Sequence, residues 1–412
     1  MNRPDVIIIG AGIVGICTAL SVVRRGMSVL MLDRAPPASE TSSGNAGVIC
    51  NSGIHPLADP ALLGNSPSLL LNRDPRLLIH YRQLPQLLPW MIRFGINCNI
   101  KTFTRCTEKI AGLTADALPR HLTLMQQAGA SDLLKHDGWL RLYRSHKTFE
   151  AAKKLTPDFD RYGVGYQTLD HTGVKDLEPD LGTEYTGALW MTETHSLHDP
   201  AMLCKKYFEL CMTEGARFTQ RQVTSLIAKA DGWDVVSEGK TYNAKKVVVT
   251  LGAWSNQLLA PLKVKLPFVM ERGYHMMFAC PADSKLGRSI VDVDLGYVLT
   301  PMNRGIRATT ASNLVARESP PDSRQLERLL PHIKQTFALG QPLLDTPWTG
   351  RRATTPDSLP LIGPLENHTG LFVATGHCHL GLTLAPITGE LIADEIIGTP
   401  DAACKPFYPC RF

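Results

Sequence analysis

The N-terminal pattern of apolar runs and glycines predicts a strand, a helix and a second strand. Residues 6–9 form an uninterrupted apolar run, typical of a buried parallel strand. Residues 10–15 are rich in glycine, and a helical stretch follows to about Arg25. Residues 27–32 form a second apolar strand. The pattern therefore predicts the start of a βαβ unit.

Further along the chain, helical and strand patterns occur in blocks. Residues from about 56 to 155 are mostly helical in pattern, and a helix is expected from Asp199, as N-cap, and Pro200 to about residue 215. Short strands fill most of the chain up to about 315. A final strand and a helix end the pattern, which predicts an α/β (α+β) protein. With 412 residues, the chain is long enough for two intimately joined domains.

Composition excludes some classes of function. The net charge of +5 is spread along the chain without a basic block, which argues against nucleic-acid binding. Ten scattered cysteines without a C-x-x-C pair indicate reduced thiols in a cytoplasmic protein. The first strand begins too early to leave room for a signal peptide.

One apolar stretch leaves two alternatives open. No segment reaches the length of about 18 apolar residues that a membrane span needs. Residues 77–96 are nevertheless apolar, with Arg82 and Arg93 interleaved. The stretch is either an amphipathic helix packed in the core and broken near Pro85 and Pro89, or a helix that lies on a bilayer surface.

The glycines of the first turn carry the clearest chemistry. Gly10, Gly12 and Gly15 form a G-x-G-x-x-G motif between a predicted strand and a helix. Such glycines allow a tight turn, let the backbone approach a pyrophosphate and let the helix pack on the strand. The helix N-terminus then presents N–H groups to the phosphates. Asp33 ends the second strand, where a carboxylate accepts hydrogen bonds from ribose hydroxyls. The motif predicts a dinucleotide site but does not decide between NAD and FAD.

Two further segments are candidates for contact with the nucleotide. The small polar loop 41–47, TSSGNAG, is equally consistent with a cofactor contact and with a surface turn. The segment 247–255 is a buried strand that ends at Gly252, where the backbone must pass close to another group, or simply a strand end in the core.

Two segments near the C-terminus carry charged and titratable side chains. Segment 350–363 contains Arg351 and Arg352 at a probable strand end, where a guanidinium can clamp a carboxylate. Both arginines can equally be solvated or brace Asp357. Segment 374–383, ATGHCHLGLT, places His377 and His379 on either side of a cysteine. Neighbouring side chains diverge, so we expect no metal site there.

Taken in order, these motifs resemble the D-amino-acid oxidase superfamily of FAD-dependent oxidoreductases. The resemblance runs from end to end and is most similar to the D-amino-acid dehydrogenase and glyphosate-oxidoreductase-like branch. It is carried by the early glycine motif, "LHDP" at 197–200, "GAWS" at 252–255, "ERGYH" at 271–275, "PDSLPLIG" at 356–363 and "GHCHLGLT" at 376–383. Ala353, Cys378 and Asn313 depart from the family pattern, so the resemblance does not fix the substrate.

The resemblance implies a Rossmann-like FAD-binding domain with an interleaved substrate domain built on a mixed β-sheet with helices. The FAD-binding domain is expected at 1–55, 196–258 and 345–412, and the substrate domain at 56–195 and 259–344. By resemblance, residues 375–383 close over the flavin. No cysteine occupies 350–363, which relatives can use for covalent attachment, so we predict non-covalent FAD.

The resemblance also assigns residues. Cofactor contacts are expected at Gly10, Gly12, Ile13, Val14, Gly15, Asp33, Arg34, Ser42, Ser43, Asn45, Ala46, Gly47, Val48, Val223, Gly252, Trp254, Arg352, Gly376, His377, His379, Leu380, Gly381 and Thr383. Arg352 is the expected ligand of a substrate carboxylate, Tyr274 and His275 are expected to line the pocket, and Arg307 is a further candidate. No general base is required, and His275 and His377 are the candidates if one exists.

The implied activity is FAD-dependent oxidation of the C–N bond of an amino acid or secondary amine through an imine. The electron acceptor is oxygen, a quinone or a protein carrier, and peripheral contact with the inner face of a membrane would favour a quinone. Two alternatives remain: a non-catalytic FAD-binding subunit of a larger amine dehydrogenase, and an NAD-dependent dehydrogenase.

Overall fold

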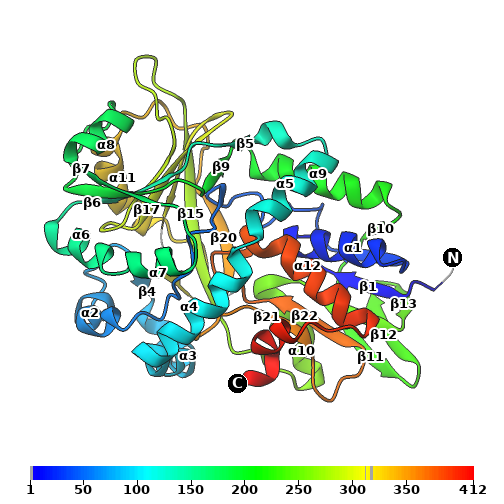
Figure 1. Ribbon diagram of the computed structural model, residues 1–412. Helices are drawn as coiled ribbons and strands as arrows, with labels where there is room; N and C mark the ends of the chain where they lie inside the picture. Colours follow the sequence, from blue (N-terminus) through cyan, green and yellow to red (C-terminus); the bar gives the residue numbers. More distant parts are fainter. Residues whose placement is uncertain (1–2, 311, 316–318) are drawn as a thin grey trace.

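The protein was analysed as a computed structural model, which describes residues 3–310, 312–315 and 319–412 (Figure 1). Its first sheet has six strands and contains the predicted βαβ start. Five strands are parallel and the last one is antiparallel. In spatial order they are β10 (Arg217–Gln220), β2 (Val29–Asp33), β1 (Val6–Ile9), β14 (Lys246–Val249), β22 (Leu371–Thr375) and β21 (Leu361–Pro364).

Both faces of this sheet are covered, which explains why its strands are continuously apolar. Val6 and Ile8 of β1 belong to a core shared with α1 (Ile13–Arg24), α9 (Pro200–Thr213) and α12 (Gly381–Ile397). In Figure 1, α1 and α12 lie side by side. The alternate residues Ile7 and Ile9 face a second core. That core is shared with α10 (Ser255–Leu259) and with a three-stranded sheet of β11 (Val223–Lys229), β12 (Gly232–Ser237) and β13 (Lys240–Ala244).

The second large sheet has ten mixed strands. Its order is β4 (Leu77–Ile79), β19 (Ser312–Leu314), β15 (Val269–Phe278), β18 (Gly305–Thr310), β17 (Tyr297–Met302), β16 (Ser289–Asp292), β6 (Trp139–Tyr143), β8 (Gly187–Met191) and β7 (Gln167–Asp170), and β20 (Trp348–Thr354) also pairs with β15. A small sheet links the two parts of the molecule through β3 (Val48–Ile49), β9 (His195–Leu197) and β5 (Leu134–Lys135).

The other helices lie mostly around the second sheet (Figure 1). They are α2 (Ala61–Leu70), α3 (Leu84–Asn97), α4 (Ile100–Thr114), α5 (Ala117–Gln127), α6 (His146–Lys153), α7 (Thr156–Arg161), α8 (His171–Leu177) and α11 (Arg324–Thr336). Short 3-10 helices are η1 (Tyr81–Gln83), η2 (Ser131–Leu133), η3 (Gly252–Trp254), η4 (Ala260–Leu262), η5 (Ala402–Phe407) and η6 (Pro409–Arg411). Over the described residues, none of the helices combines the length and the hydropathy needed to cross a bilayer.

The predicted mixed α/β architecture is confirmed, and so is the helix that starts at Asp199 and Pro200. The Asp199 side chain accepts a hydrogen bond from the backbone N–H of Met202, as an N-cap does. The domain boundaries stay a prediction. Within the predicted segment 345–412, β20 pairs with β15 of the second sheet, so this strand joins the two parts.

The prediction for residues 77–96 is wrong in two respects. The first three residues form strand β4, and helix α3 begins at Leu84. Pro85 lies in the first helical turn, where a missing N–H costs no hydrogen bond, and the helix continues through Pro89. Leu87 is the single buried residue of α3 and belongs to a small core cluster with Ile79, Val269 and Leu314, so the helix packs one face on the protein and leaves the other exposed.

Candidate active site

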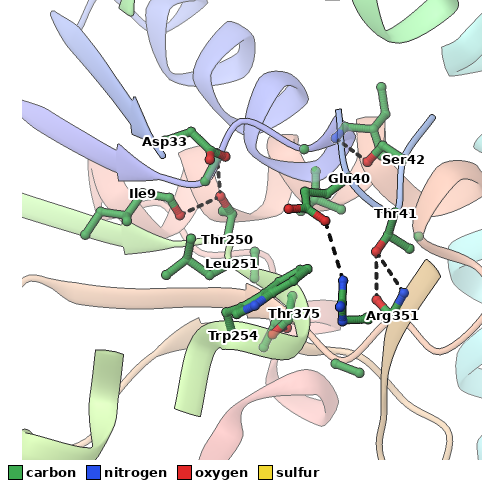
Figure 2. Close-up of a pocket in the computed structure, with 18 of the residues that line it drawn as sticks. Ile9, Asp33, Glu40, Thr41, Ser42, Thr250, Leu251, Trp254, Arg351 and Thr375 are labelled. Atoms are coloured by element: carbon green, nitrogen blue, oxygen red, sulfur yellow. Dashed lines mark hydrogen bonds and ion pairs between the residues drawn. The ribbon is translucent and has the colours of Figure 1, made fainter. Parts of the chain in front are cut away.

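A cavity of about 420 Å³ opens at the carboxyl ends of β1, β2, β14 and β22 (Figure 2). Ligands bind at this edge of open parallel sheets, because the connections to the helices diverge there. Sixteen of the predicted cofactor residues line it: Gly10, Gly12, Ile13, Val14, Asp33, Arg34, Ser42, Asn45, Val223, Gly252, Trp254, Arg352, Gly376, His377, His379 and Gly381.

Seven predicted cofactor residues are not among those that line the cavity: Gly15, Ser43, Ala46, Gly47, Val48, Leu380 and Thr383. Several of them hold the lining in place instead. The hydroxyl of Thr383, for example, accepts a hydrogen bond from the backbone N–H of Cys50. The sequence reasoning missed Glu40 and Arg221, which do line the cavity. Thr250 and Arg351, from the candidate segments 247–255 and 350–363, line it as well. Arg221 directly follows β10, so the carboxyl end of that strand is the signal that could have found it.

The glycines of the first turn have the close contacts that a nucleotide-binding turn requires. Gly10 has a φ of +112°, and a Cβ there would lie 2.7 Å from the carbonyl oxygen of Thr250. A Cβ on Gly15 would lie only 2.0 Å from the carbonyl oxygen of Gly10. At Gly12, which lines the cavity, the nearest atom to such a Cβ is the hydroxyl of Ser42 at 3.3 Å. Gly15 therefore serves packing, and Gly12 leaves room for a ligand.

Two side chains fix the shape of this turn. One carboxylate oxygen of Asp33 accepts the backbone N–H of Ala11 at 2.7 Å, and the other accepts that of Ala35 at 3.0 Å. The Thr250 hydroxyl donates to the carbonyl oxygens of Ile9 and Gly10, at 3.0 and 2.9 Å (Figure 2). Each carboxylate oxygen has a second lone pair, so Asp33 can still accept from a ribose hydroxyl.

The loop 41–47 is held against β20. The Thr41 hydroxyl donates to the carbonyl oxygen of Arg351 at 2.9 Å and accepts its N–H at 3.1 Å (Figure 2). Asn45 closes the loop on itself, since its amide donates to the Ser42 carbonyl and its side-chain oxygen accepts from Gly47. The loop therefore takes a defined form beside the cavity, and the alternative of a plain surface turn is not supported.

Arg307 also serves this loop. Its guanidinium donates to the carbonyl oxygen of Asn45 at 2.6 Å. Burial lowers its pKa to about 10, which leaves the group charged at neutral pH. Arg307 thus acts on the loop backbone in the structure, whereas the sequence offered it as a candidate substrate ligand.

Two arginines contact the aromatic ring of Trp254 in the cavity lining. The guanidinium of Arg34 is 4.7 Å from the ring centroid of Trp254, and that of Arg351 is 5.5 Å away. Glu40 pairs with Arg34 at 2.9 Å and reaches Arg351 at 3.8 Å. Glu40 follows β2, Arg351 lies on β20 and Trp254 follows β14, so these contacts join three segments that are distant in the chain. Figure 2 shows all three side chains.

His275 faces the loop 41–47 as a neutral ring. Its Nδ1 lies 2.9 Å from the carbonyl oxygen of Gly44 and must donate, because a carbonyl only accepts. The ring stacks on Trp348 with centroids 4.7 Å apart. Burial and the charge of Arg307 lower the pKa of His275 to about 4. The Nε2 lone pair is then available as a proton acceptor.

The two histidines of segment 374–383 have different surroundings. The Nε2 of His377 lies 3.0 Å from the hydroxyl of Thr388 inside α12, so this side chain packs against the helix that follows it in the chain. His379 is exposed and lines the cavity, and desolvation, aided by the charge of Arg352, lowers its pKa to about 4. Burial lowers the pKa of His377 to about 4 as well. Among the residues that the structure describes, no set of three or more metal-binding side chains is placed to hold a metal ion.

Tyr274 points away from His275, since neighbouring strand residues face opposite sides of the sheet. It is buried, and its hydroxyl accepts the backbone N–H of Asp322 at 2.9 Å. The cavity lining does not include it. Tyr274 therefore braces the start of α11, and the expectation that it lines the pocket is not supported.

Arg352 reaches the cavity with its charge already paired. Its guanidinium forms an ion pair with Glu271, which lies opposite it across β15 and β20. Ser312 and Thr354 also donate hydroxyl hydrogen bonds to Glu271, at 2.7 and 2.8 Å. Burial by itself raises the pKa of Glu271, but Arg352 and these hydroxyls together bring it below its usual value. The carboxylate is therefore ionised beside Arg352.

The donor set fits FAD. The glycine turn leaves space at Gly12 for a pyrophosphate, Asp33 offers a carboxylate for ribose, and residues 376–379 and Gly381 line the same cavity. Gly376, with a φ of +74°, starts that segment, and α12 begins at Gly381, so a helix N-terminus and its partial positive charge face the cavity. These features match a long, anionic dinucleotide.

Known proteins resemble the chain over its full length. A D-amino-acid oxidase from Bradyrhizobium diazoefficiens is 30% identical, with 99% of this chain and 98% of the relative covered. A D-amino acid dehydrogenase from Methylobacterium nodulans is 28% identical over 99% of both chains. The fold is similar to that of glycine oxidase from Geobacillus kaustophilus, with a TM-score of 0.78, 20% identity and full coverage of both chains.

The sequence pattern of one protein family, described as FAD dependent oxidoreductase, matches residues 5–395. This match spans the glycine turn, the second sheet and α12, and it confirms both the resemblance identified from the motifs and FAD as the cofactor. The chain therefore belongs to the FAD-dependent oxidoreductase family that includes the D-amino-acid oxidases.

Proposed function

We propose that the protein oxidises the C–N bond of an amino acid or a secondary amine to an imine, which water then hydrolyses. The observation that carries this proposal is the cavity itself, whose lining combines the nucleotide-binding turn with the neutral His379 and the paired Arg352. The named activities of the relatives, D-amino-acid oxidase and D-amino acid dehydrogenase, agree with it.

FAD would be held by the residues that line the cavity and, when bound, accepts the hydride from the substrate carbon. The protein contributes position and electrostatics. The N-terminus of α12, which lines the cavity, would present backbone N–H groups to the negative charge that develops on the flavin. A substrate amine that binds in its neutral form needs no protein base for hydride loss, and the proton that leaves nitrogen can pass to solvent or to Nε2 of His275.

We propose non-covalent attachment of FAD. Segment 350–363 has no cysteine, and Cys378 is the one cysteine in the cavity lining. The thiol of Cys378 lies 3.6 Å from the carbonyl oxygen of Gly376, and burial raises its pKa to about 12. Because the thiolate is the reactive form, this side chain is a poor nucleophile at neutral pH. Acid precipitation should release all of the flavin into the supernatant, and flavin retained in the pellet would refute this proposal.

The first experiment is an anaerobic titration of the purified, FAD-loaded protein, with the visible flavin band as the signal. D-amino acids, their L-enantiomers, sarcosine, prolines and N-substituted glycines form the panel. Bleaching by one group supports the proposal and names the substrate class. A yellow protein that none of them bleaches would favour the alternative of a non-catalytic subunit.

We further propose that α3 and the start of α4 rest on a membrane surface, in a protein that is otherwise cytoplasmic. Leu88, Ile92, Ile96 and Ile100 follow one another at helical spacing and are 50, 54, 69 and 71% exposed. Arg82, Arg93 and Lys101 are exposed around them, a combination that suits an anionic bilayer surface. In Figure 1, α2 and α3 lie together at the edge of the molecule. This placement favours a quinone over oxygen or a protein carrier as electron acceptor.

Vesicle sedimentation tests this surface. The wild-type protein should sediment with vesicles that contain anionic lipid, and Ile96→Asp should abolish the effect. Ile227→Asp is the matched control, because Ile227 is 48% exposed on β11, in another part of the structure. Equal sedimentation of the wild-type protein and Ile96→Asp would contradict the proposal.

A further inference from the structure

The segment that follows α12 folds back over strand β21. It contains the 3-10 helices η5 and η6, and in Figure 1 this red segment lies beside β21. Cys404 and Phe407 are buried in the core that β1, α1 and α12 share. A Cβ on Gly363 of β21 would lie 2.6 Å from the ring of Tyr408. The segment is therefore a packed part of the fold, and it brings Arg411 to a defined place.

Arg411 donates hydrogen bonds from all three nitrogens of its guanidinium. Its Nε and one Nη donate to the two carboxylate oxygens of Asp357, at 2.8 and 3.1 Å. The same Nη donates to the carbonyl oxygen of Leu359 at 2.7 Å, and the other Nη donates to that of Pro360 at 3.0 Å. The side chains of the ion pair are only 15% and 6% exposed. Arg411 thus fixes the short loop 355–360, which joins β20 to β21.

The same loop packs against residues that line the cavity. The Thr355 hydroxyl donates to the carbonyl oxygen of Leu359 at 2.8 Å and lies 3.7 Å from the thiol of Cys378. A Cβ on Gly376 would lie 2.9 Å from the methyl group of Thr355. Gly376 and Cys378 both line the cavity. The loop therefore lies between Arg411 and the cavity lining.

Cys378 needs support from its neighbours because its backbone is strained. Its φ is +51°, in the left-handed region that a residue with a Cβ rarely adopts. Its N–H donates to the carbonyl oxygen of Ala353 at 3.1 Å, and a turn follows that is closed by a bond from the N–H of Leu380 to the carbonyl of His377. This turn brings His379 and the N-terminus of α12 to the cavity. Such a conformation persists only where the surrounding structure fixes it.

The loop is strained as well, and it contains a buried charge. Ser358 has a φ of +67°, and its hydroxyl accepts the backbone N–H of Leu57 at 2.9 Å. Asp357 accepts the backbone N–H of Leu359 at 3.1 Å inside the loop. Without Arg411 this buried carboxylate would lose its countercharge, and the loop would have to rearrange to hydrate it.

We propose that Arg411 is a positioning residue for the flavin. Through Asp357 and the loop 355–360 it holds the turn at Cys378, which presents residues 376–381 to the bound cofactor. Arg411 and Asp357 are not among the residues that line the cavity, so they act through the loop. The inference rests on the proposed function in one point, the placing of the flavin beside residues 376–381.

Two properties of the bound flavin test this role without turnover. FAD affinity is measured by equilibrium titration of the flavin-free protein. The midpoint potential of the bound flavin is measured by reductive titration against a dye of known potential. The variants are Arg411→Gln, Arg411→Lys, Asp357→Asn and the double variant Arg411→Gln with Asp357→Asn, and melting temperatures are recorded for all of them.

Arg144→Gln is the matched control. Arg144 pairs with the buried Asp292 at 2.6 Å in the second sheet, and neither residue lines the cavity. This variant loses a comparable ion pair and should lose folding stability, but it should keep the wild-type FAD affinity and potential.

The Kd for FAD should rise about 2- to 30-fold in Arg411→Gln, the range for residues that act on a ligand through packed neighbours. The potential should become more negative, because N–H groups at the start of α12 that are displaced stabilise the reduced flavin less well. The double variant should bind FAD no more weakly than Arg411→Gln, since the two residues act as one pair. Arg411→Lys keeps the charge and should recover part of both properties.

A folded Arg411→Gln variant with wild-type Kd and wild-type potential would overturn the proposal. A higher Kd with an unchanged potential would also overturn it, and so would an equal loss of FAD affinity in Arg144→Gln. If Arg411→Gln does not fold, Arg411→Lys and Asp357→Asn are judged by the same two measurements.

The outcomes separate this inference from the proposed reaction. If an amine bleaches the flavin while Arg411→Gln keeps the wild-type Kd and potential, the role of Arg411 is refuted and the reaction stands. If Arg411→Gln shifts both properties while no amine bleaches the flavin, the positioning role stands and the reaction is refuted.

Discussion

The two glycines of the first turn have different tasks in the structure, and exchanging each for alanine separates them. A Cβ at position 15 would lie 2.0 Å from the carbonyl oxygen of Gly10 and 2.6 Å from the hydroxyl of Thr250. Both contacts are with groups fixed by β1 and β14, so the helix has to move. Overpacking of this kind costs about 1–3 kcal/mol of folding stability, or more. Gly15→Ala should therefore unfold at clearly lower urea concentration, even without FAD.

Gly12→Ala should leave the fold nearly unchanged. Gly12 has a φ of −72°, which alanine adopts without strain, and the added Cβ meets only the Ser42 hydroxyl at 3.3 Å. The poorer N-cap is offset by the lower entropy of the unfolded chain, each worth about 0.5–1 kcal/mol. The new methyl group instead projects into the cavity where a pyrophosphate would approach. We expect FAD affinity to fall by about 10-fold or more, equivalent to about 1.4 kcal/mol.

The assay pairs urea unfolding of both flavin-free variants with equilibrium titration of FAD. Because both variants exchange glycine for alanine within one turn, each serves as the control for the other. Gly15→Ala should lose folding stability, whereas Gly12→Ala should lose FAD affinity. Equal destabilisation of the two variants, or wild-type FAD affinity in Gly12→Ala, would refute the assignment of packing to Gly15 and of ligand approach to Gly12.

Three further outcomes follow from side chains around the site. The pKa of His377 is about 4 in the fold against an ordinary value near 6.5, so the unfolded chain binds the extra proton and stability should fall as pH drops from about 6.5 to 4. The variant His377→Gln can still hydrogen-bond Thr388 but cannot take up the proton, so its melting temperature should depend less steeply on pH in that window. An unchanged dependence of the melting temperature on pH would contradict this. Arg307→Met should weaken FAD binding, measured by flavin fluorescence, because the bond to the carbonyl of Asn45 is lost; unchanged affinity would count against a role in the loop. Asp292→Asn removes the buried charge that pairs with Arg144 at 2.6 Å. It should lower the free energy of unfolding in urea by about 3–5 kcal/mol, with FAD affinity retained.

Much of the nucleotide end could be predicted from the sequence, because its geometry is local. The turn at 10–15 requires glycine within a few residues of a strand, and Asp33 follows the next strand directly. Steric exclusion of a Cβ and the end of a parallel strand act over short distances in the chain. Sixteen of the predicted contacts accordingly line the cavity.

The substrate end could not be predicted in the same way. All but one of the ten residues of β15 are buried, so the sequence shows no alternation that tells which side chains face the cavity. Tyr274 and His275 were therefore both expected to line it, but neither is among the lining residues, and as neighbours on one strand they face opposite sides of the sheet.

The sequence by itself determined the family, the cofactor and the nucleotide turn, because these depend on motifs whose residues are close together in the chain. Only the tertiary structure decided the electrostatics of the substrate end. Glu271 lies 81 residues from Arg352 in the chain, yet strand pairing brings them together and compensates the charge of the predicted carboxylate ligand. Charge compensation depends on which distant strands are neighbours, and no local pattern encodes that.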